Sequence, residues 1–193
     1  MKIDIILAGV GGQGILSIAT ILGHAAIGEN LYLKQAEVHG MSQRGGDVQS
    51  HLRISDKPIA SDLIAEGKAD MIISIEPMEA LRYLPMLKPD GWVITNTTPF
   101  KNIGNYPADE ELTKCINSLP HKIAIDADTI AKDLGTARSA NMVILGAASL
   151  FLDMHIDIIE KAVREIFERK GQAVVEANIT ALRAGRTFAE QHK

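Results

Sequence analysis

The stretch that decides the fold class reads IDIILAGVGGQG and covers residues 3–14. Its first half is a short apolar run, rich in isoleucine, that predicts a buried strand over residues 3–8 rather than a helix. Its second half matches the pattern GxGxxG directly after that strand. Apolar residues at three-to-four spacing then predict a helix over residues 15–27, which Gly28 can end. We therefore expect a strand, a glycine turn and a helix in succession.

The rest of the chain continues this alternation of strands and helices. Apolar runs of strand length lie at residues 30–36, 48–54, 69–75, 92–96 and 122–125. Helical patterns cover residues 76–87, residues 108–117 and nearly everything after residue 128. This order predicts an α/β fold, a three-layer α/β/α sandwich with a mostly parallel, Rossmann-like sheet and C-terminal helices. No linker or repeat interrupts it, so we expect residues 1–193 to form a single domain.

Three details of the sheet are also expected. A strand, turn, helix, strand unit connects residues 3–8 with residues 30–36, and such a crossover predicts that these two strands pair in parallel. Residues 48–54 alternate only loosely, which predicts a strand with one wet face near an edge of the sheet. The tripeptide Pro89-Asp90-Gly91 predicts a turn of the chain before the next strand.

Composition and charge exclude several classes of protein. Twenty Lys and Arg against 24 Asp and Glu give a net charge of −4 without a basic cluster, so nucleic-acid binding is disfavoured. No apolar run approaches the roughly 20 residues of a membrane span, and no segment has the pattern of a signal peptide. Cys115 is the only cysteine, which excludes an intramolecular disulfide and the usual four-thiolate iron–sulfur site. This cysteine usage favours a reducing compartment, so we expect a cytoplasmic protein.

The glycine turn is the first candidate site. Its candidate ligand-binding residues are Gly9, Gly11, Gly12, Gln13 and Gly14. Without side chains, the backbone can turn sharply and let an anionic group approach the amide hydrogens at the helix N-terminus. The alternative is that the glycines only permit a tight turn and close helix packing. No GK[ST] follows them, so nucleotide hydrolysis is disfavoured.

The second candidate site is the segment EVHGMSQRGG at residues 37–46, which has no periodicity and is predicted to be a loop. Loops that follow parallel strands emerge at the same carboxyl edge, so this segment should lie beside the glycine turn. Its candidate ligand-binding residues are Glu37, Gln43, Arg44, Gly45 and Gly46. Glu37 is a candidate for the ribose-binding acid of a dinucleotide site, and the planar guanidinium of Arg44 suits phosphate or carboxylate. The alternative is an exposed loop whose charges are only solvated.

Other polar residues have simpler interpretations. His39 and His51 are typical of hydrogen-bonded surface groups. Asp126 and Asp128 flank a predicted helix start and are expected to cap it, and Cys115 is expected to pack on an amphipathic helix. No nucleophile stands with a base and an orienting group, so no catalytic residue is assigned.

Four stretches carry a resemblance to a known family. They are GVGGQG at residues 9–14, EVHGMSQRGGDVQSHLRIS at 37–55, NMVILGA at 141–147 and ANITALRAG at 177–185. In these stretches the sequence resembles the gamma domain of the 2-oxoacid:ferredoxin oxidoreductases, and most closely the small beta subunits of the indolepyruvate:ferredoxin oxidoreductases. The stretch with QRGG and the following basic strand is the most specific of the four. Together they span nearly the whole chain in order.

The resemblance implies a reaction and a division of labour. The reaction is the coenzyme A-linked oxidative decarboxylation of aryl 2-oxoacids such as indolepyruvate, with ferredoxin as electron acceptor. Thiamine diphosphate and iron–sulfur clusters are then expected in a large alpha subunit. This chain is expected to be a required subunit, inactive alone and without cofactors of its own, that shapes the active-site mouth or the coenzyme A path. Two other functions stay open: a free-standing NAD(P)-binding oxidoreductase, and a regulatory module that senses a nucleotide or coenzyme A.

Overall fold

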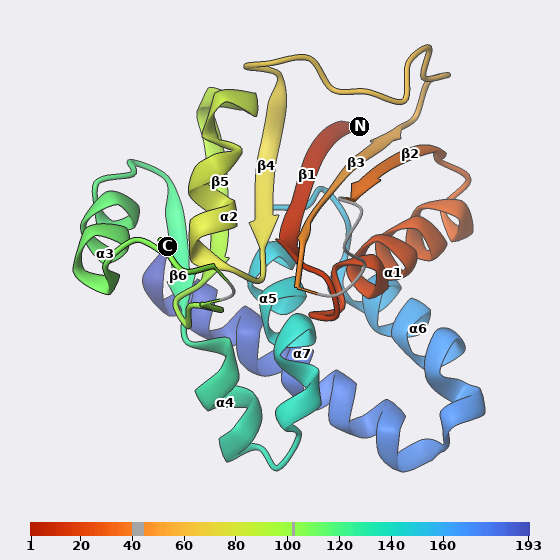
Figure 1. The fold of residues 1–193 in the computed structure, drawn as a ribbon. Helices are drawn as coiled ribbons and strands as arrows, with labels where there is room; N and C mark the ends of the chain where they lie inside the picture. The colour runs from red at the N-terminus through yellow and green to blue at the C-terminus, as the bar shows by residue number, and fades with distance from the viewer. Residues whose placement is uncertain (40–44, 102) are drawn as a thin grey trace.

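The computed structural model describes residues 1–39, 45–101 and 103–193, which form a six-stranded sheet between two layers of helices (Figure 1). The strands are β1 (Lys2–Val10), β2 (Tyr32–His39), β3 (Asp47–Ser55), β4 (Ala69–Ser74), β5 (Leu87–Asn96) and β6 (Lys122–Ile125). The helices are α1 (Ile15–Gly28), α2 (Pro77–Arg82), α3 (Asp109–Asn117), α4 (Ala127–Asp133), α5 (Ala140–Ser149), α6 (Ile156–Phe167) and α7 (Gln172–His192). Short 3₁₀ turns lie at η1 (Leu84–Met86), η2 (Ala137–Ser139) and η3 (Glu168–Lys170). The predicted three-layer sandwich with its mostly parallel sheet and C-terminal helices is confirmed.

The sheet order is β2-β3-β1-β4-β5-β6, and it corrects one expectation and confirms another. β1, β4, β5 and β6 pair in parallel, but β3 lies between β1 and β2 and runs antiparallel to both. The predicted direct pairing of the first two strands is therefore wrong, because the short connection after β2 lets β3 fold back and take the place beside β1. The edges of the sheet are β2 and β6, and β3 lies directly beside the edge strand β2, so the prediction of a strand near an edge is confirmed.

Local boundaries also differ from the sequence-based expectations. Glu37 lies inside β2 and not in a loop, because β3 supplies the strand with a hydrogen-bonding partner. The turn predicted at Pro89-Asp90-Gly91 lies inside β5, where the pairing with β4 is irregular. The helix predicted from residue 76 ends at Arg82, since Pro85 cannot continue it and falls in η1.

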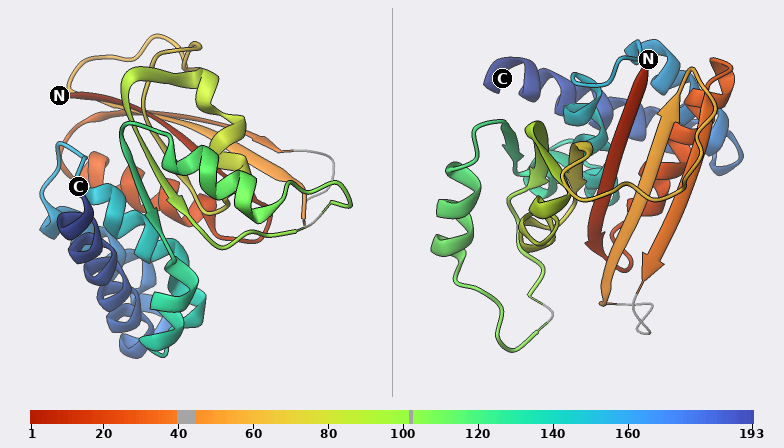
Figure 2. Two further views of the ribbon diagram at one scale, coloured as in Figure 1. Left: turned by 90° about the vertical axis from the view of Figure 1, so that its left-hand side faces the viewer. Right: turned by 90° about the horizontal axis from the view of Figure 1, so that it is seen from above.

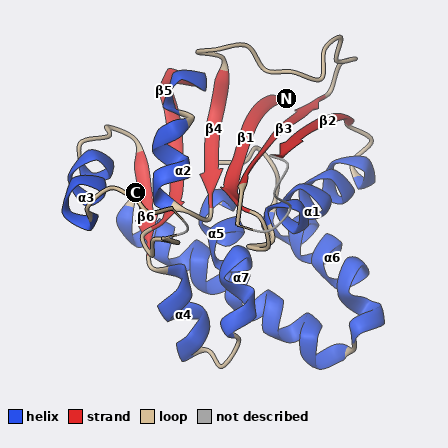
Figure 3. Ribbon diagram, in the orientation of Figure 1, coloured by secondary structure: helices blue, strands red, loops and turns tan. Residues whose placement is uncertain are grey.

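The two faces of the sheet carry cores of different size. α1, α5, α6 and α7 lie over one face, where a large aliphatic cluster includes Ile5, Leu7 and Ile73. α2 and α3 lie over the other face, where a small cluster contains Ile6 and Ile72. Figure 2 shows the two helical layers on opposite sides of the sheet, and Figure 3 shows that the longer helices belong to the first layer. Successive strand residues point to opposite faces, so β1 and β4 each contribute to both clusters.

Helices α5 and α7 pack with their backbones almost in contact. A Cβ on Gly146 would lie 1.8 Å from the Leu182 carbonyl oxygen, and one on Gly185 would lie 1.9 Å from the Val143 carbonyl oxygen. Any side chain at these two positions would therefore push the helices apart. Gly146 belongs to NMVILGA and Gly185 to ANITALRAG, so two stretches that are far apart in the sequence meet in space.

Candidate functional site

The glycine turn joins the end of β1 to the start of α1 at the carboxyl edge of the sheet. Gly12 and Gly14 have φ angles of 103° and 86°, a left-handed conformation that other residues rarely adopt. Gly14 is also the N-cap of α1, which has neither a capping side chain nor an acidic residue in its first turn. The positive end of the α1 dipole is therefore not offset by a carboxylate of the helix itself.

Gly45 and Gly46, the described residues directly before β3, lie against the glycine turn, as predicted for this segment. The Gly11 amide donates to the Gly46 carbonyl oxygen at 2.8 Å, and the Gly45 amide donates to the Gly11 carbonyl oxygen at 3.4 Å. β1 and β2 run in the same direction, so the chain leaves both strands at one edge of the sheet. The candidate residues Gln43 and Arg44 lie outside the described residues.

Part of the hydrogen-bonding capacity of the turn is used internally. The Gln13 amide donates to the Val10 carbonyl oxygen at 3.1 Å, and the Gln13 side-chain oxygen accepts a hydrogen bond from the Val10 amide at 2.8 Å. The side-chain oxygen of Gln13, a candidate ligand contact, is thus already occupied by a hydrogen bond within the turn. Within the described chain, the Gly12 and Gly14 amides have no hydrogen-bond partner and remain available to a ligand.

A residue that sequence reasoning did not single out contacts the far end of the turn. The Asn141 side-chain amide donates to the Gly14 carbonyl oxygen at 3.3 Å, across 127 residues of sequence. Asn141 is the first residue of the NMVILGA stretch. The family resemblance therefore pointed to this stretch, but it did not predict the contact between Asn141 and Gly14.

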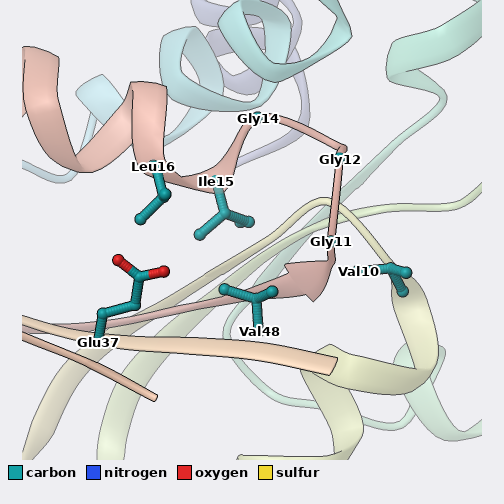
Figure 4. A pocket seen from close by; sticks show the side chains of 8 residues that line it. All are labelled: Val10, Gly11, Gly12, Gly14, Ile15, Leu16, Glu37 and Val48. Atoms are coloured by element: carbon teal, nitrogen blue, oxygen red, sulfur yellow. The ribbon is translucent and has the colours of Figure 1, made fainter. Parts of the chain in front are cut away.

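A cavity of about 360 Å³ opens beside the turn (Figure 4). It is lined by Val10, Gly11, Gly12, Gly14, Ile15, Leu16, Glu37 and Val48. Figure 4 shows the Glu37 carboxylate facing Ile15 and Leu16 across the space. The volume falls in the range of small-molecule sites, and the cavity brings Glu37 together with three of the candidate glycines.

A larger groove of about 760 Å³ lies next to the same turn, toward α5 and α7. Its walls come from the turn, from the segment around η2 and from the first half of α7. Arg138 and Lys170 line it, and no carboxylate belongs to the lining that the structure describes. The turn therefore separates a largely apolar cavity, which contains a carboxylate, from a groove that contains two cations.

On the α2 side of the same edge, the structure buries a carboxylate that sequence reasoning missed. Glu76 is fully buried, and its carboxylate accepts hydrogen bonds from the Glu79 amide at 2.8 Å, the Phe100 amide at 3.2 Å and the Tyr106 hydroxyl. Burial and the Glu76 carboxylate raise the pKa of Tyr106, so this phenol stays protonated and donates. Glu76 thereby fastens Phe100 and Tyr106, in the connection before α3, to the start of α2. Glutamate is an uncommon N-cap, which explains why the sequence pattern did not reveal it.

The histidine and aspartate interpretations have mixed outcomes. His51 is buried with 6% exposure rather than at the surface, and its Nδ1 accepts a hydrogen bond from the Ile64 amide at 3.0 Å. Burial, with the nearby Arg53 charge, lowers the pKa of His51 below its ordinary value of 6.5, which suits a neutral ring that accepts. Asp126 caps α4 as predicted, whereas Asp128 accepts a hydrogen bond from the Asn96 side chain.

Cys115 lies on the amphipathic helix α3 as predicted, but the prediction that it packs there is wrong. Its side chain is exposed, because the buried stripe of α3 consists of Leu112 and Ile116. In the part of the chain that the structure describes, no three His, Cys, Asp or Glu side chains are grouped to hold a metal ion. Among the same residues, none of the helices combines the length and apolarity needed to cross a membrane.

Comparison with known proteins gives similarity along nearly the whole chain. The family model described as pyruvate ferredoxin/flavodoxin oxidoreductase matches residues 4–188. The chain is 38% identical over 194 residues to the indolepyruvate oxidoreductase subunit IorB of Archaeoglobus fulgidus, an alignment that covers 96% of this chain and 94% of that protein.

Solved structures share the fold. The gamma subunit of a keto/oxoacid ferredoxin oxidoreductase from Geobacter sulfurreducens superposes with a TM-score of 0.72 at 26% identity, covering 98% of this chain and 99% of that one. The 2-oxoglutarate:ferredoxin oxidoreductase of Magnetococcus marinus, solved with 2-oxoglutarate, coenzyme A and succinyl-CoA bound, has a TM-score of 0.78 at 22% identity. That alignment covers 98% of this chain and 31% of the longer chain, so the same fold there forms part of a larger polypeptide.

Proposed function

Because the chain belongs to the pyruvate ferredoxin/flavodoxin oxidoreductase family, we propose that it is the small subunit of a complex that oxidises aryl 2-oxoacids such as indolepyruvate. The complex decarboxylates the 2-oxoacid, transfers the acyl group to coenzyme A and passes the electrons to ferredoxin. The observation that carries this proposal is the 38% identity with an indolepyruvate oxidoreductase subunit over nearly the full length of both proteins.

In this proposal the chain works as one gamma-type domain, residues 1–193, in the cytoplasm and in complex with a large alpha subunit. The alpha subunit carries thiamine diphosphate and the iron–sulfur clusters. The usual four-thiolate cluster does not fit this chain, because Cys115 is its only cysteine. The thiamine cofactor generates the reactive carbanion, so the task left to this subunit is to orient substrates and to supply electrostatic stabilisation.

The glycine turn, at the carboxyl edge of the sheet, is the proposed contact for coenzyme A. The Gly12 and Gly14 amides lack partners in the described chain, and they stand at the start of a helix without acidic first-turn residues. Both features favour a phosphate group. The hydrogen bond between Gly11 and Gly46 supports the sequence-based assignment of both glycine segments to one site.

The free-standing NAD(P) alternative has less support. In a Rossmann dinucleotide site, the ribose-binding acid follows the strand that lies next to the first strand. Here β3 separates β2 from β1, so Glu37 stands one strand further from the glycine turn than that arrangement requires. No observation favours the sensing module over the subunit.

The test is reconstitution with the large alpha subunit. We expect the isolated chain to be colourless and inactive. The complex should reduce ferredoxin with an aryl 2-oxoacid only when coenzyme A is present. The proposal fails if the two chains do not associate, or if the alpha subunit alone reaches the rate of the complex.

Calorimetric titration of the isolated chain with NAD(H) and NADP(H) examines the alternative directly. Micromolar binding that Glu37→Ala abolishes would replace the proposal with a dinucleotide-binding function. Absence of binding is the result that the proposed function predicts.

A further inference from the structure

We infer that Asn141 is a positioning residue that sets the direction of the amides with which the glycine turn contacts its ligand. The inference rests on the proposed function, in which that ligand is coenzyme A. Asn141 lies on α5, and its side-chain amide donates to the Gly14 carbonyl oxygen at 3.3 Å. The contact is close, because a Cβ on Gly14 would lie 2.7 Å from the Asn141 Nδ2 atom.

The Gly14 carbonyl controls the neighbouring amide through the geometry of the peptide bond. The Gly14 carbonyl and the Ile15 amide belong to one planar peptide unit and point in opposite directions. A hydrogen bond that holds the carbonyl therefore also helps to fix the direction of the Ile15 amide, the first of α1. Like the Gly12 and Gly14 amides, the Ile15 amide has no hydrogen-bond partner in the described chain, so it belongs to the same set of donors left for a ligand. Gly14 has no Cβ and adopts a left-handed conformation, so its backbone has little restraint of its own. Its carbonyl oxygen accepts a hydrogen bond from the Ser17 amide of α1 at 3.1 Å, and Asn141 adds a second donor from outside that helix.

The turn is held at both ends, by residues of different origin. At its start, the Gln13 side-chain oxygen accepts a hydrogen bond from the Val10 amide, a contact local in sequence. At its end, the partner is Asn141, which is 127 residues away from Gly14. Between these two contacts lies the Gly12 amide, which has no partner among the residues that the structure describes. The two side chains thus bracket the amides that are left for a ligand.

Asn141 does not serve its own helix. The N-cap of α5 is Ser139, whose side chain makes no capping hydrogen bond to this helix. The Ser139 hydroxyl instead donates to Asn178 Oδ1 at 3.2 Å, and the Asn178 side-chain amide donates to the Val174 carbonyl oxygen at 2.8 Å. The start of α5 is therefore hydrogen-bonded to α7 through Ser139 and Asn178. Asn141, two residues after Ser139, contacts the glycine turn.

The helix pair that carries Asn141 is rigid, because α5 and α7 pack with their backbones in contact at Gly146 and Gly185. Nearly all of α5 is buried, so the helix cannot rotate without disrupting the large core. This arrangement assigns a role to the two C-terminal stretches, NMVILGA and ANITALRAG. They form the support that presents Asn141 to the turn.

The test compares Asn141→Asp and Asn141→Leu in the reconstituted complex with the wild type. Both replacements are close in size to asparagine but cannot donate to the Gly14 carbonyl. We expect the KM for coenzyme A to rise about tenfold, as the loss of one hydrogen bond to a binding element allows, while the KM for the aryl 2-oxoacid stays within about twofold. Asn117→Asp, at an exposed position on α3, is the matched control and should change neither constant.

A second readout is independent of activity. Hydrogen exchange of the peptide covering residues 9–16 should be faster in the isolated Asn141→Asp chain than in the wild type, and unchanged in Asn117→Asp. If wild-type turnover does not depend on coenzyme A, the proposed function fails, whereas the exchange result still reports on the positioning contact.

Several outcomes would overturn the inference itself. One is a wild-type complex that depends on coenzyme A while both Asn141 variants keep the wild-type KM for it. Another is a parallel rise of both KM values, or a failure of both variants to fold, because either would assign Asn141 to general packing. Unchanged exchange in residues 9–16 would have the same meaning.

Discussion

The face of the sheet under α1, α5, α6 and α7 is packed mainly with aliphatic side chains, whereas the face under α2 and α3 buries charged groups beside a few apolar ones. Ile72 and Ile73 are neighbours in β4, yet the first belongs to the small cluster and the second to the large one. On the large face, hydrophobic burial holds long helices in place. On the small face, buried His51 and Glu76 accept hydrogen bonds from the Ile64 and Phe100 amides of connecting segments. Buried Asp4 holds Arg53, which in turn donates to the Leu63 carbonyl oxygen.

This difference shows two ways of fixing a site on one sheet. Long helices cover enough apolar area to be held by packing, and they carry Asn141 to the glycine turn. The six-residue helix α2 is too short to be held by packing alone, so its surroundings rely on specific polar contacts. Removing one partner of such a contact leaves a buried polar group without a hydrogen bond, which lowers stability. The large face should therefore be most sensitive to changes of volume, and the small face to changes of charge.

The largest effect is expected for Gly146→Ala on the large face. The added methyl group would lie 1.8 Å from the Leu182 carbonyl oxygen, so α5 and α7 must separate. We expect a loss of more than about 3 kcal/mol in the free energy of unfolding, measured by urea denaturation with circular dichroism.

Gly28→Ala is the matched control, because a Cβ there meets no heavy atom within 4 Å. Its stability should stay within about 1 kcal/mol of the wild type, given the difference in helix propensity. Equal stability of the two variants would contradict the close packing of α5 and α7.

An intermediate effect is expected for Arg53→Met on the small face. Arg53 donates to both carboxylate oxygens of buried Asp4, at 2.8 and 3.1 Å, and to the Ser61 and Leu63 carbonyl oxygens. Burial raises the pKa of Asp4, but the hydrogen bonds and charges of Arg53 and Lys2 outweigh it and lower the pKa overall. Removal of the guanidinium should cost about 2 kcal/mol, less than for a fully buried pair, because Arg53 keeps 16% exposure.

The double variant Asp4→Leu/Arg53→Met sharpens this result, since it removes the buried charge together with its partner. It should be more stable than Arg53→Met alone in the same urea titration. If the double variant is the less stable of the two, the carboxylate does not depend on Arg53 in the way described.

The smallest effect is a pH dependence that comes from His51. Its pKa is lowered in the folded protein, so below pH 6.5 the unfolded chain binds more protons than the folded one. The contribution of His51 to stability is therefore complete above pH 6.5 and is lost as the pH falls toward the lowered value. His51→Asn should flatten the stability profile in that window, at a cost of about 1 kcal/mol near pH 7 for the altered hydrogen bond to the Ile64 amide.

His155→Asn provides the comparison for this profile, because His155 is an exposed histidine outside the small face. The slope below pH 6.5 should persist in this variant. A slope that survives in His51→Asn would mean that another group causes it.

Local patterns were sufficient for much of the fold. The apolar run before Gly9, the glycine turn and the apolar stripe of α1 predicted their elements closely, because turn chemistry and periodicity act within a few residues. β6 was predicted with its exact bounds for the same reason. The insertion of β3 between β1 and β2 was missed, because strand order depends on which segments pair after the chain folds back.

The features of the candidate site also divide into those that local sequence predicts and those that depend on tertiary packing. The amino-acid sequence alone determined that glycine segments stand at the ends of strands, that the chain lacks the cysteines for an iron–sulfur cluster, and which family it resembles. Only the tertiary structure decided that Gly11 pairs with Gly46, that Asn141 contacts Gly14 and that Glu76 is buried. Backbone conformation follows from neighbouring residues, whereas a hydrogen bond across 127 residues exists only when packing brings its two ends together.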